Sequence, residues 1–193
     1  ATGMVGQGVL AQCLEKSEVE AVLVVGRTAL GVTHPKLTEV LHPDLYDCGP
    51  IAERLRGYDA CFFCLGVSAG GMNEEQYHRV TYELTLAVAQ TLVKLDPAMT
   101  FIYVSGEGTD STEKGRAMWA RVKGKTENAL LELGFKQAFM FRPGYIQPMR
   151  GIKSKTKSYR VMYAVVGPLY PLWKTLFPKY VTNTDKVGNA MIQ

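Results

Sequence analysis

Short apolar runs alternate along the chain with longer segments in which apolar residues recur at a helical period. The runs are typical of strands that are buried on both faces of a sheet. They occupy residues 21–26, 59–66, 99–106 and 137–144, with a further short run around 39–42. The helical segments occupy residues 5–16, 73–95 and 113–133, the last followed by Gly134 as its C′ residue. Because strands alternate with helices, the pattern predicts an α/β fold with a parallel sheet.

The chain has 193 residues, of which 47% are hydrophobic and 21% are charged. This length predicts one domain over residues 1–193, and we find no internal repeat and no low-complexity linker. The four cysteines lack the spacing of a disulfide scaffold, which indicates a reducing compartment. No run of apolar residues is long enough to predict a membrane-spanning helix. We therefore expect a cytosolic (cytoplasmic) protein.

The net charge of +4 is concentrated in one segment. Residues 150–179 contain seven Lys/Arg and no Asp or Glu, whereas the rest of the chain has 15 basic and 18 acidic residues. A nucleic-acid-binding protein would carry its basic residues over a broad face. The distribution of charge therefore argues against nucleic acid as a partner.

The chain begins with ATGMVG, in which Gly3 and Gly6 have the spacing of the last two glycines of a G-x-x-G-x-x-G loop. In a doubly wound parallel sheet of the Rossmann type, such a loop follows the first strand, and the pyrophosphate of a dinucleotide rests on the next helix. Glycine lets the backbone approach the phosphates closely. We therefore predict a Rossmann-type doubly wound sheet whose first strand, with one glycine, is missing from this sequence. Given ordinary strand lengths, the natural protein is expected to begin about eight residues or more earlier.

The next strand ends about twenty residues after the loop, where a dinucleotide-binding fold contacts the adenosine ribose. Gly26 and Arg27 occupy that position. An acidic residue there would accept a hydrogen bond from the ribose 2′-hydroxyl, whereas an arginine accommodates a 2′-phosphate. The sequence thus predicts NADP(H) as the preferred cofactor, with NAD(H) as the alternative.

Seven segments of the chain follow the order of a known family. They are ATGMVG (1–6), VVGR (24–27), Asp44-Leu45, CLGVS (64–68), YVSGEGTD (103–110), WARVKGKTE (119–127) and FRPGYI (141–146). They resemble the short-chain dehydrogenase/reductase superfamily, and most closely its atypical members, the NmrA-like regulators and the small Tat-interacting-protein type of reductase.

The resemblance implies a set of cofactor contacts and two catalytic residues. The cofactor contacts fall on Thr2, Gly3, Met4, Val5, Gly6, Arg27, Asp44, Leu45, Leu65, Gly66, Val67, Lys123, Pro143, Gly144 and Ile146. Ser105 would orient the substrate, and Lys123 would bind the ribose and assist proton transfer. The family places its tyrosine acid four residues before that lysine, but this chain has Trp119 there. An indole has no proton that it can transfer near neutral pH.

Three solutions to the missing acid stay open. Lys123 itself supplies the proton, if desolvation lowers its pKa. Another phenol, that of Tyr145 or Tyr77, supplies it instead. The third solution is a protein that catalyses no reaction and reports the state of its cofactor. Trp119 is then either a packing residue or a surface on which the substrate stacks.

Further candidate residues have ordinary explanations. Cys61 and Cys64 have redox spacing, but they lie within a predicted strand, and no second pair completes a zinc site. The three histidines are widely separated, so we predict no metal. Glu107 and Asp110 follow a predicted strand, where they either contact the substrate or are solvated loop acids.

Residues 145–193 are expected to form the substrate side, because the superfamily builds its substrate pocket after the RPG turn. Within this segment, residues 150–180 combine basic residues with aromatics and three prolines. They fit a solvated loop followed by a short helix that caps the core, or a pocket for an anionic or aromatic substrate. A membrane-surface element also fits, but is less favoured than the pocket. A final helix is predicted from Thr184 as N-cap, and we expect the natural chain to continue beyond it.

The residues and the resemblance together predict an NADP(H)-binding oxidoreductase that transfers a hydride between NADPH and a small carbonyl or quinone-like substrate. The alternative is a cofactor-sensing protein without turnover, which acts through a protein partner as NmrA-like regulators do. A nucleoside-diphosphate-sugar epimerase is the third hypothesis, weakened because it too requires the absent tyrosine.

Overall fold

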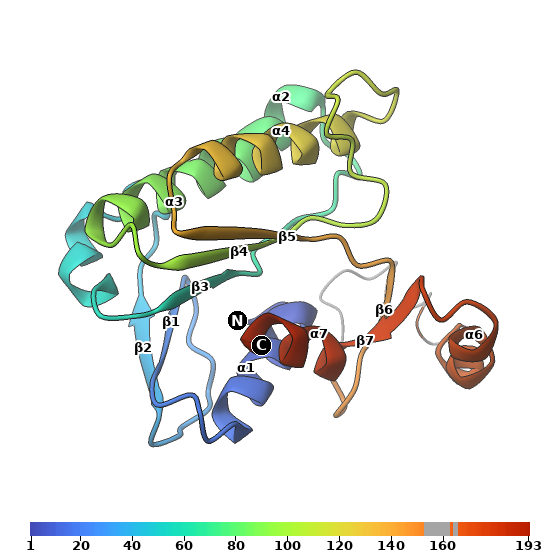
Figure 1. Cartoon of the computed structure of the whole chain (residues 1–193), viewed down its shortest axis with the longest axis horizontal. Coiled ribbons are helices and arrows are strands. Elements are labelled where there is room, and N and C mark those ends of the chain that lie inside the picture. Colours follow the sequence, from blue (N-terminus) through green and yellow to red (C-terminus); the bar gives the residue numbers. More distant parts are fainter. Residues whose placement is uncertain (153–162, 164–165) are drawn as a thin grey trace. The chain divides into compact units, whose positions relative to one another are not determined.

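A computed structural model describes residues 1–152, 163 and 166–193 of the chain (Figure 1). The chain divides into two compact units, one formed by Ala1–Leu41 with Pro143–Gln193 and the other by His42–Arg142. The strands that are described pair in parallel, as the α/β prediction requires. That residues 1–193 form a single domain stays a prediction.

The first unit contains the first and last helices of the chain. Its elements are α1 (Met4–Glu15), β1 (Val22–Gly26), β2 (Leu37–Leu41), β6 (Tyr145–Gln147), the 3-10 turn η3 (Gly167–Leu169), α6 (Tyr170–Leu176), β7 (Val181–Asn183) and α7 (Thr184–Ile192). Strand β1 pairs with β2, and β6 pairs with β7. Helices α1 and α7 lie side by side (Figure 1). Two glycines permit this contact, because a Cβ on Gly8 would lie 2.6 Å from the Thr184 side chain and one on Gly188 would lie 2.8 Å from Gln12.

Two expectations for this unit are wrong in detail. In β1 only Val24 is buried, so the strand is less covered than its sequence predicts, in a sheet of two described strands. The N-cap of α7 is Asn183, whose side chain accepts a hydrogen bond of 2.8 Å from the backbone N–H of Lys186. The predicted cap, Thr184, is buried, and its hydroxyl instead accepts from the backbone N–H of Met149 at 3.1 Å.

The C-terminal segment is described in part. The basic stretch at residues 153–162 lies outside the described residues. The short helix that was expected after it is α6, but none of its side chains is buried. The solvated-loop interpretation included a helix that caps the core. Helix α6 does not do so, and that part of the interpretation is wrong.

The second unit is a three-stranded parallel sheet with helices packed on it. Its elements are the 3-10 helix η1 (Gly49–Leu55), β3 (Ala60–Phe63), α2 (Glu74–His78), the π-helical turn η2 (Arg79–Glu83), α3 (Leu84–Leu95), β4 (Thr100–Val104), α4 (Met118–Glu132) and β5 (Gln137–Phe141). The strand order is β3-β4-β5, and α3 and α4 cover one face of this sheet (Figure 1). Central strand β4 is the most buried, and Phe101 stacks on Phe63 and Phe135 with ring centroids 5.9 and 5.1 Å away. The long apolar run of β4 is thus explained by its central position.

The predicted helix boundaries in this unit are confirmed at one end and wrong at the other. Gly134 ends α4 with a φ of 88°, a conformation that glycine adopts without strain. The start is Met118 rather than residue 113, because the Asp110 carboxylate accepts hydrogen bonds from three backbone N–H groups between residues 112 and 115. The helix expected at 73–95 is α2, η2 and α3 in succession, and Asn73 forms a capping box at its start.

Candidate functional site

The glycine-rich loop forms the N-terminus of α1, as the sequence predicts. Gly3 is the N-cap in an extended conformation, without a side-chain cap, and the first turn contains no acidic residue. The side chain of Gln7 donates to the carbonyl of Thr2 at 3.0 Å and so braces the loop. A Cβ on Gly6 would lie 3.0 Å from the Cα of Ala1, which explains the requirement for glycine there. Backbone N–H groups at the start of a helix, without a competing acid, fit a pyrophosphate.

Arg27 follows the last residue of β1 and is exposed. Its guanidinium forms no ion pair or hydrogen bond with any residue that the structure describes, so it is open to an anion. The loop after it folds back on β2, because the backbone N–H of Leu30 donates to the Glu39 carboxylate at 2.8 Å. This arrangement is compatible with the predicted 2′-phosphate contact.

Other predicted cofactor residues lie on loops that follow strands. Asp44 is exposed and accepts from the backbone N–H of Tyr46 at 2.9 Å, so its carboxylate holds a turn. Leu65, Gly66 and Val67 form the loop after β3, with the last two exposed. The cofactor contacts of Asp44, Leu45 and this loop stay predictions.

The RPG turn is constrained by the backbone. A Cβ on Gly144 would lie 2.6 Å from the carbonyl oxygen of Tyr180. The same carbonyl accepts from the backbone N–H of Tyr145 at 2.9 Å, which continues the β6–β7 pairing. Pro143 is partly exposed, whereas Ile146 is buried within β6. Gly144 therefore has a packing role, and the cofactor role of these three residues stays a prediction.

The two predicted catalytic residues are brought together. Ser105 follows β4, and Lys123 on α4 donates a hydrogen bond from Nζ to the Ser105 carbonyl oxygen. The loop after Ser105 lies directly on α4, because the backbone N–H of Asp110 donates to the Ala120 carbonyl at 3.1 Å. Such close approach requires Gly124, where a Cβ would lie 1.8 Å from the Asp110 carbonyl oxygen. The geometry thus fixes Lys123 beside the end of β4.

Burial changes the acidity of this lysine. Desolvation lowers the pKa of Lys123, while the negative charge of Glu127 partly opposes the shift by raising it. A lowered pKa is the condition under which the ammonium group can act as a general acid near neutral pH.

We expect the ε-amine of Lys123 to lose its proton at a pH below the value of about 10.4 found for free lysine. Competitive labelling with acetic anhydride across a pH series, read by mass spectrometry, measures this pKa. The same residue in the urea-unfolded chain supplies the reference. An equal pKa in the folded and unfolded chains would contradict the prediction.

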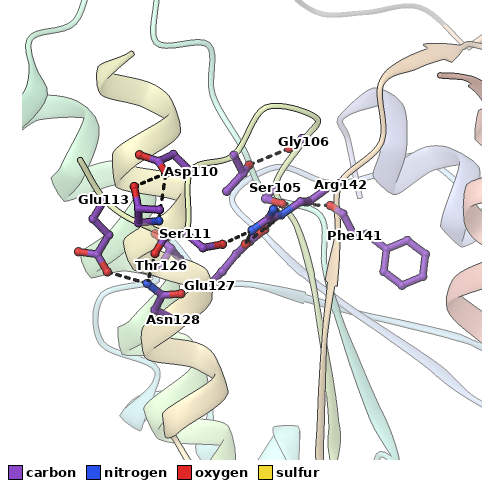
Figure 2. Close-up of polar contacts among 12 residues, drawn as sticks. Ser105, Gly106, Asp110, Ser111, Glu113, Thr126, Glu127, Asn128, Phe141 and Arg142 are labelled. Carbon is purple, nitrogen blue, oxygen red and sulfur yellow. Dashed lines mark hydrogen bonds and ion pairs between the residues drawn. The ribbon is translucent and has the colours of Figure 1, made fainter. Parts of the chain in front are cut away.

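A buried carboxylate that the sequence did not predict holds this region together (Figure 2). Glu127 lies one helical turn after Lys123 and is 2% exposed. Its Oε1 accepts a hydrogen bond from the Ser105 hydroxyl. Arg142 donates to both carboxylate oxygens, with Nε 3.1 Å from each, and also donates to the Ser111 hydroxyl. The hydroxyl hydrogen of Ser105 is therefore directed at Glu127.

The sequence contained a partial signal for Glu127. An acid four residues after Lys123 shares its helix face, and Glu127 is one of the buried residues of α4. Arg142 lies in the RPG segment but is 15 residues away in sequence, so no local pattern joins it to Glu127.

Trp119 packs against the loop after β4. It lies one turn before Lys123 on α4 and is partly exposed. A Cβ on Gly108 would lie 3.3 Å from Cη2 of the indole. This contact favours the packing interpretation of Trp119, while substrate stacking stays a prediction.

Neither predicted phenol is an evident acid. Tyr77 is 2% exposed. The hydroxyl of Tyr145 donates to the Gln147 side chain at 2.6 Å, and burial raises the pKa of Tyr145. Tyr103, two residues before Ser105, is also buried, and burial raises the pKa of its phenol. Each of these phenols is thus a weaker acid, or less accessible, than a free tyrosine.

The remaining acids and thiols have structural explanations. Asp110 holds the loop before α4, and hydrogen bonds from Thr112 and nearby backbone groups lower the pKa of its carboxyl. Glu107 is exposed on the same loop. Cys61 is a free thiol whose pKa burial raises to about 12, the opposite of a reactive thiolate. Within the described residues, no cluster of His, Cys, Asp or Glu could hold a metal ion, and no helix is long and apolar enough to cross a membrane.

Comparisons with known proteins give relatives at low identity. No family model matches the chain. It is 27% identical over 195 residues to Protein fmp52-2, mitochondrial, of Aspergillus terreus, a match that covers 99% of this chain and 82% of that protein. It is 26% identical over 148 residues to Protein HTATIP2 of Rattus norvegicus, covering 76% of this chain and 60% of that protein.

Comparison with solved structures identifies the fold. An oxidoreductase of the short-chain dehydrogenase/reductase family from Burkholderia thailandensis matches with a TM-score of 0.66 and 17% identity, over 99% of this chain and 80% of that chain. The chain has the short-chain dehydrogenase/reductase fold. This confirms the predicted Rossmann-type fold and the resemblance to the superfamily.

Two further solved structures with a similar fold hold a nicotinamide cofactor. WbmH of Bordetella bronchiseptica, in complex with NAD+, has a TM-score of 0.65 and 14% identity, over 98% of this chain and 68% of that chain. NADPH-bound carbonyl reductase from chicken fatty liver has a TM-score of 0.59 and 15% identity, over 100% of this chain and 86% of that chain. The chain therefore shares its fold with proteins whose solved structures hold NAD+ or NADPH.

The prediction of a cytosolic protein is wrong. Four relatives, 25–27% identical to the chain, carry the word mitochondrial in their names. Cysteine spacing distinguishes oxidising from reducing surroundings, but it does not distinguish one reducing compartment from another. The sequence features that we used therefore could not identify the organelle.

Proposed function

We propose that the protein is an NADP(H)-dependent reductase of small carbonyl or quinone-like molecules, in which Lys123 donates the proton. The observation that supports this most is the hydrogen bond from Lys123 Nζ to the Ser105 carbonyl. The Ser105 hydroxyl already donates to Glu127, whereas an ammonium group retains further N–H donors. Lys123 is therefore the best proton donor beside the end of β4.

The residues present fit a nicotinamide dinucleotide. The uncapped N-terminus of α1, residues 2–6, would hold the pyrophosphate, and Arg27 would bind the 2′-phosphate. Neighbours that hold NAD+ or NADPH support this class of cofactor. We retain NADP(H) as the preferred form because an arginine, rather than an acid, follows β1.

When bound, NADPH supplies a hydride to the carbonyl carbon of the substrate. The ammonium group of Lys123 donates a proton to the carbonyl oxygen, so the carbonyl becomes an alcohol. Because burial disfavours the charged form of Lys123, this proton is released more easily than from a solvated lysine. The neutral amine then regains a proton from solvent. Glu127 and Arg142 fix Ser105 throughout, and so hold the carbonyl oxygen that positions Lys123.

Arg27→Ala is expected to abolish the preference for NADPH over NADH. A charge-assisted hydrogen bond to phosphate contributes roughly 1.5–3 kcal/mol, so the Kd for NADPH should rise by about 10- to 100-fold. The Kd for NADH should stay nearly unchanged, because NADH has no 2′-phosphate. Fluorescence titration of the full-length protein with both cofactors measures the two constants.

Arg116→Ala is the matched control, because Arg116 is also exposed but precedes α4. It should leave both Kd values unchanged. If Arg27→Ala retains the NADPH preference, then another residue binds the 2′-phosphate. If the parent protein binds neither cofactor at millimolar concentration, both the reductase and the sensor are excluded.

Two observations favour a cofactor sensor without turnover as the second candidate. The indole of Trp119 packs on the loop at Gly108, in place of the family's acid. The hydroxyl of Ser105 is engaged by Glu127 rather than free to donate to a carbonyl. A sensor would bind NADP(H) as tightly as the reductase does and would transmit the cofactor state to a protein partner.

The names of the relatives support a mitochondrial setting for either function. Subcellular fractionation of the tagged full-length protein, with a mitochondrial and a cytosolic marker, tests this. Recovery with the cytosolic marker alone would exclude it.

A further inference from the structure

Helix α6 and the residues beside it, near the C-terminus, expose several large apolar side chains. Helix α6 contains no buried side chain. Five large apolar residues in and beside it are about half exposed, and we call them the α6 patch. They are Leu169 (46%), Leu172 (51%), Leu176 (56%), Phe177 (50%) and Tyr180 (57%). Large apolar patches on soluble domains usually mark sites of interaction.

The patch is interspersed with positive charge. Lys174 lies within α6, and Lys179 lies two residues after Phe177. Neither lysine forms an ion pair within the part of the chain that the structure describes. Arg150, at the start of the same basic segment, is already paired with Glu15 and Asp185, so it contributes little free charge. No acidic residue occurs between residues 150 and 179.

We propose that the α6 patch docks on an anionic lipid surface. Apolar and aromatic side chains would enter the boundary between headgroups and acyl chains, while the lysines would contact the anionic headgroups. A protein partner is disfavoured, because lysine is depleted in protein–protein interfaces. This proposal does not depend on cofactor binding.

Flotation of the full-length protein with vesicles of phosphatidylcholine, with and without phosphatidylserine, tests the proposal. The protein should float with the anionic vesicles and lose this binding at high salt. Leu172→Ser with Leu176→Ser should lower the bound-to-free ratio at least about tenfold, because two half-exposed leucines no longer enter the lipid. Leu131→Ser is the matched control, since Leu131 is 58% exposed on α4 and should float like the parent.

A second pair of variants tests the role of charge without changing the apolar surface. Lys174→Glu with Lys179→Glu should reduce binding to anionic vesicles, whereas Lys94→Glu with Lys136→Glu, at exposed positions of the other unit, should reduce it much less. Circular dichroism confirms that each variant is folded.

Three results would overturn the proposal. The first is no flotation with anionic vesicles. The second is equal flotation of the parent, the leucine variant and the Lys174/Lys179 variant. The third is a dimer, seen by light scattering, that Leu172→Ser with Leu176→Ser converts to a monomer, because a second copy of the chain would then be the occupant of the patch.

Discussion

Lys123→Ala is expected to lower the turnover number about 10²- to 10⁴-fold, the usual contribution of a positioned general acid. The loss arises because Trp119 has no transferable proton and the Ser105 hydroxyl is directed at Glu127. The Kd for NADPH should rise far less, since the loop at the start of α1 would still hold the pyrophosphate. Stopped-flow oxidation of NADPH with a panel of carbonyl and quinone acceptors measures the first quantity, and titration measures the second.

Lys125→Ala is the control on the same helix. The Lys125 ammonium lies 4.9 Å from the centre of the Tyr82 ring, whereas the bond to the Ser105 carbonyl belongs to Lys123. Lys125→Ala should leave turnover unchanged. If Lys123→Ala lowers only the affinity for cofactor, or if the parent shows no turnover with any acceptor, the sensor is the better explanation.

The pH dependence of turnover gives an independent check on the role of Lys123. A general acid must be protonated, so the rate of carbonyl reduction should fall as the pH rises through the lowered pKa of Lys123. The reverse oxidation needs the neutral amine and should rise over the same range. A flat profile for both directions would assign proton transfer to another group.

Apolar runs predicted where the strands lie, because the apolar residues of a strand are written in its own sequence, although its burial depends on its place in the sheet. The run at 99–106 is strand β4, at the centre of the second unit. Helix starts were predicted less well, because they depend on where polar side chains find partners. Asp110 bonds to the backbone between residues 112 and 115 and so delays α4 to Met118. Thr184 is bonded to Met149, 35 residues away, and the cap moves to Asn183.

In the candidate site too, some residues could be predicted from the sequence and others could not. The resemblance identified Ser105 and Lys123, and the structure joins them by a hydrogen bond. It could not identify the pairing of Glu127 with Arg142, because that contact forms only when β5 lies beside β4 and brings the end of β5 to the face of α4. Composition and periodicity describe each residue's own element, whereas an ion pair between elements depends on the tertiary fold.

Arg142→Ala is expected to lower the free energy of unfolding of the chain by about 3 kcal/mol, because it removes the cation that is hydrogen-bonded to the buried Glu127 carboxylate and leaves only the more distant charge of Lys123. This value is the lower end of the range for breaking a buried ion pair. The Arg142 side chain is 39% exposed, so water can partly solvate the Glu127 carboxylate once the arginine is removed. Urea unfolding followed by circular dichroism measures the change. Arg56→Ala is the control, because Arg56 and its partner Glu53 are 51% and 82% exposed, and its loss should cost under about 1 kcal/mol.

A double variant separates the buried charge from the lost packing. If the orphaned carboxylate causes the instability, then adding Glu127→Gln to Arg142→Ala should recover at least about 1 kcal/mol, because a neutral amide is cheaper to bury than an ion. Glu127→Gln alone should instead destabilise the protein, since it weakens the bonds to Arg142 and Ser105. Opposite signs for one substitution in two backgrounds show that the two side chains are energetically coupled, as the ion pair between them requires. Equal effects in both backgrounds would mean that Arg142 stabilises the fold through its contact with Ser111 or through packing, and that Ser105 is held without it.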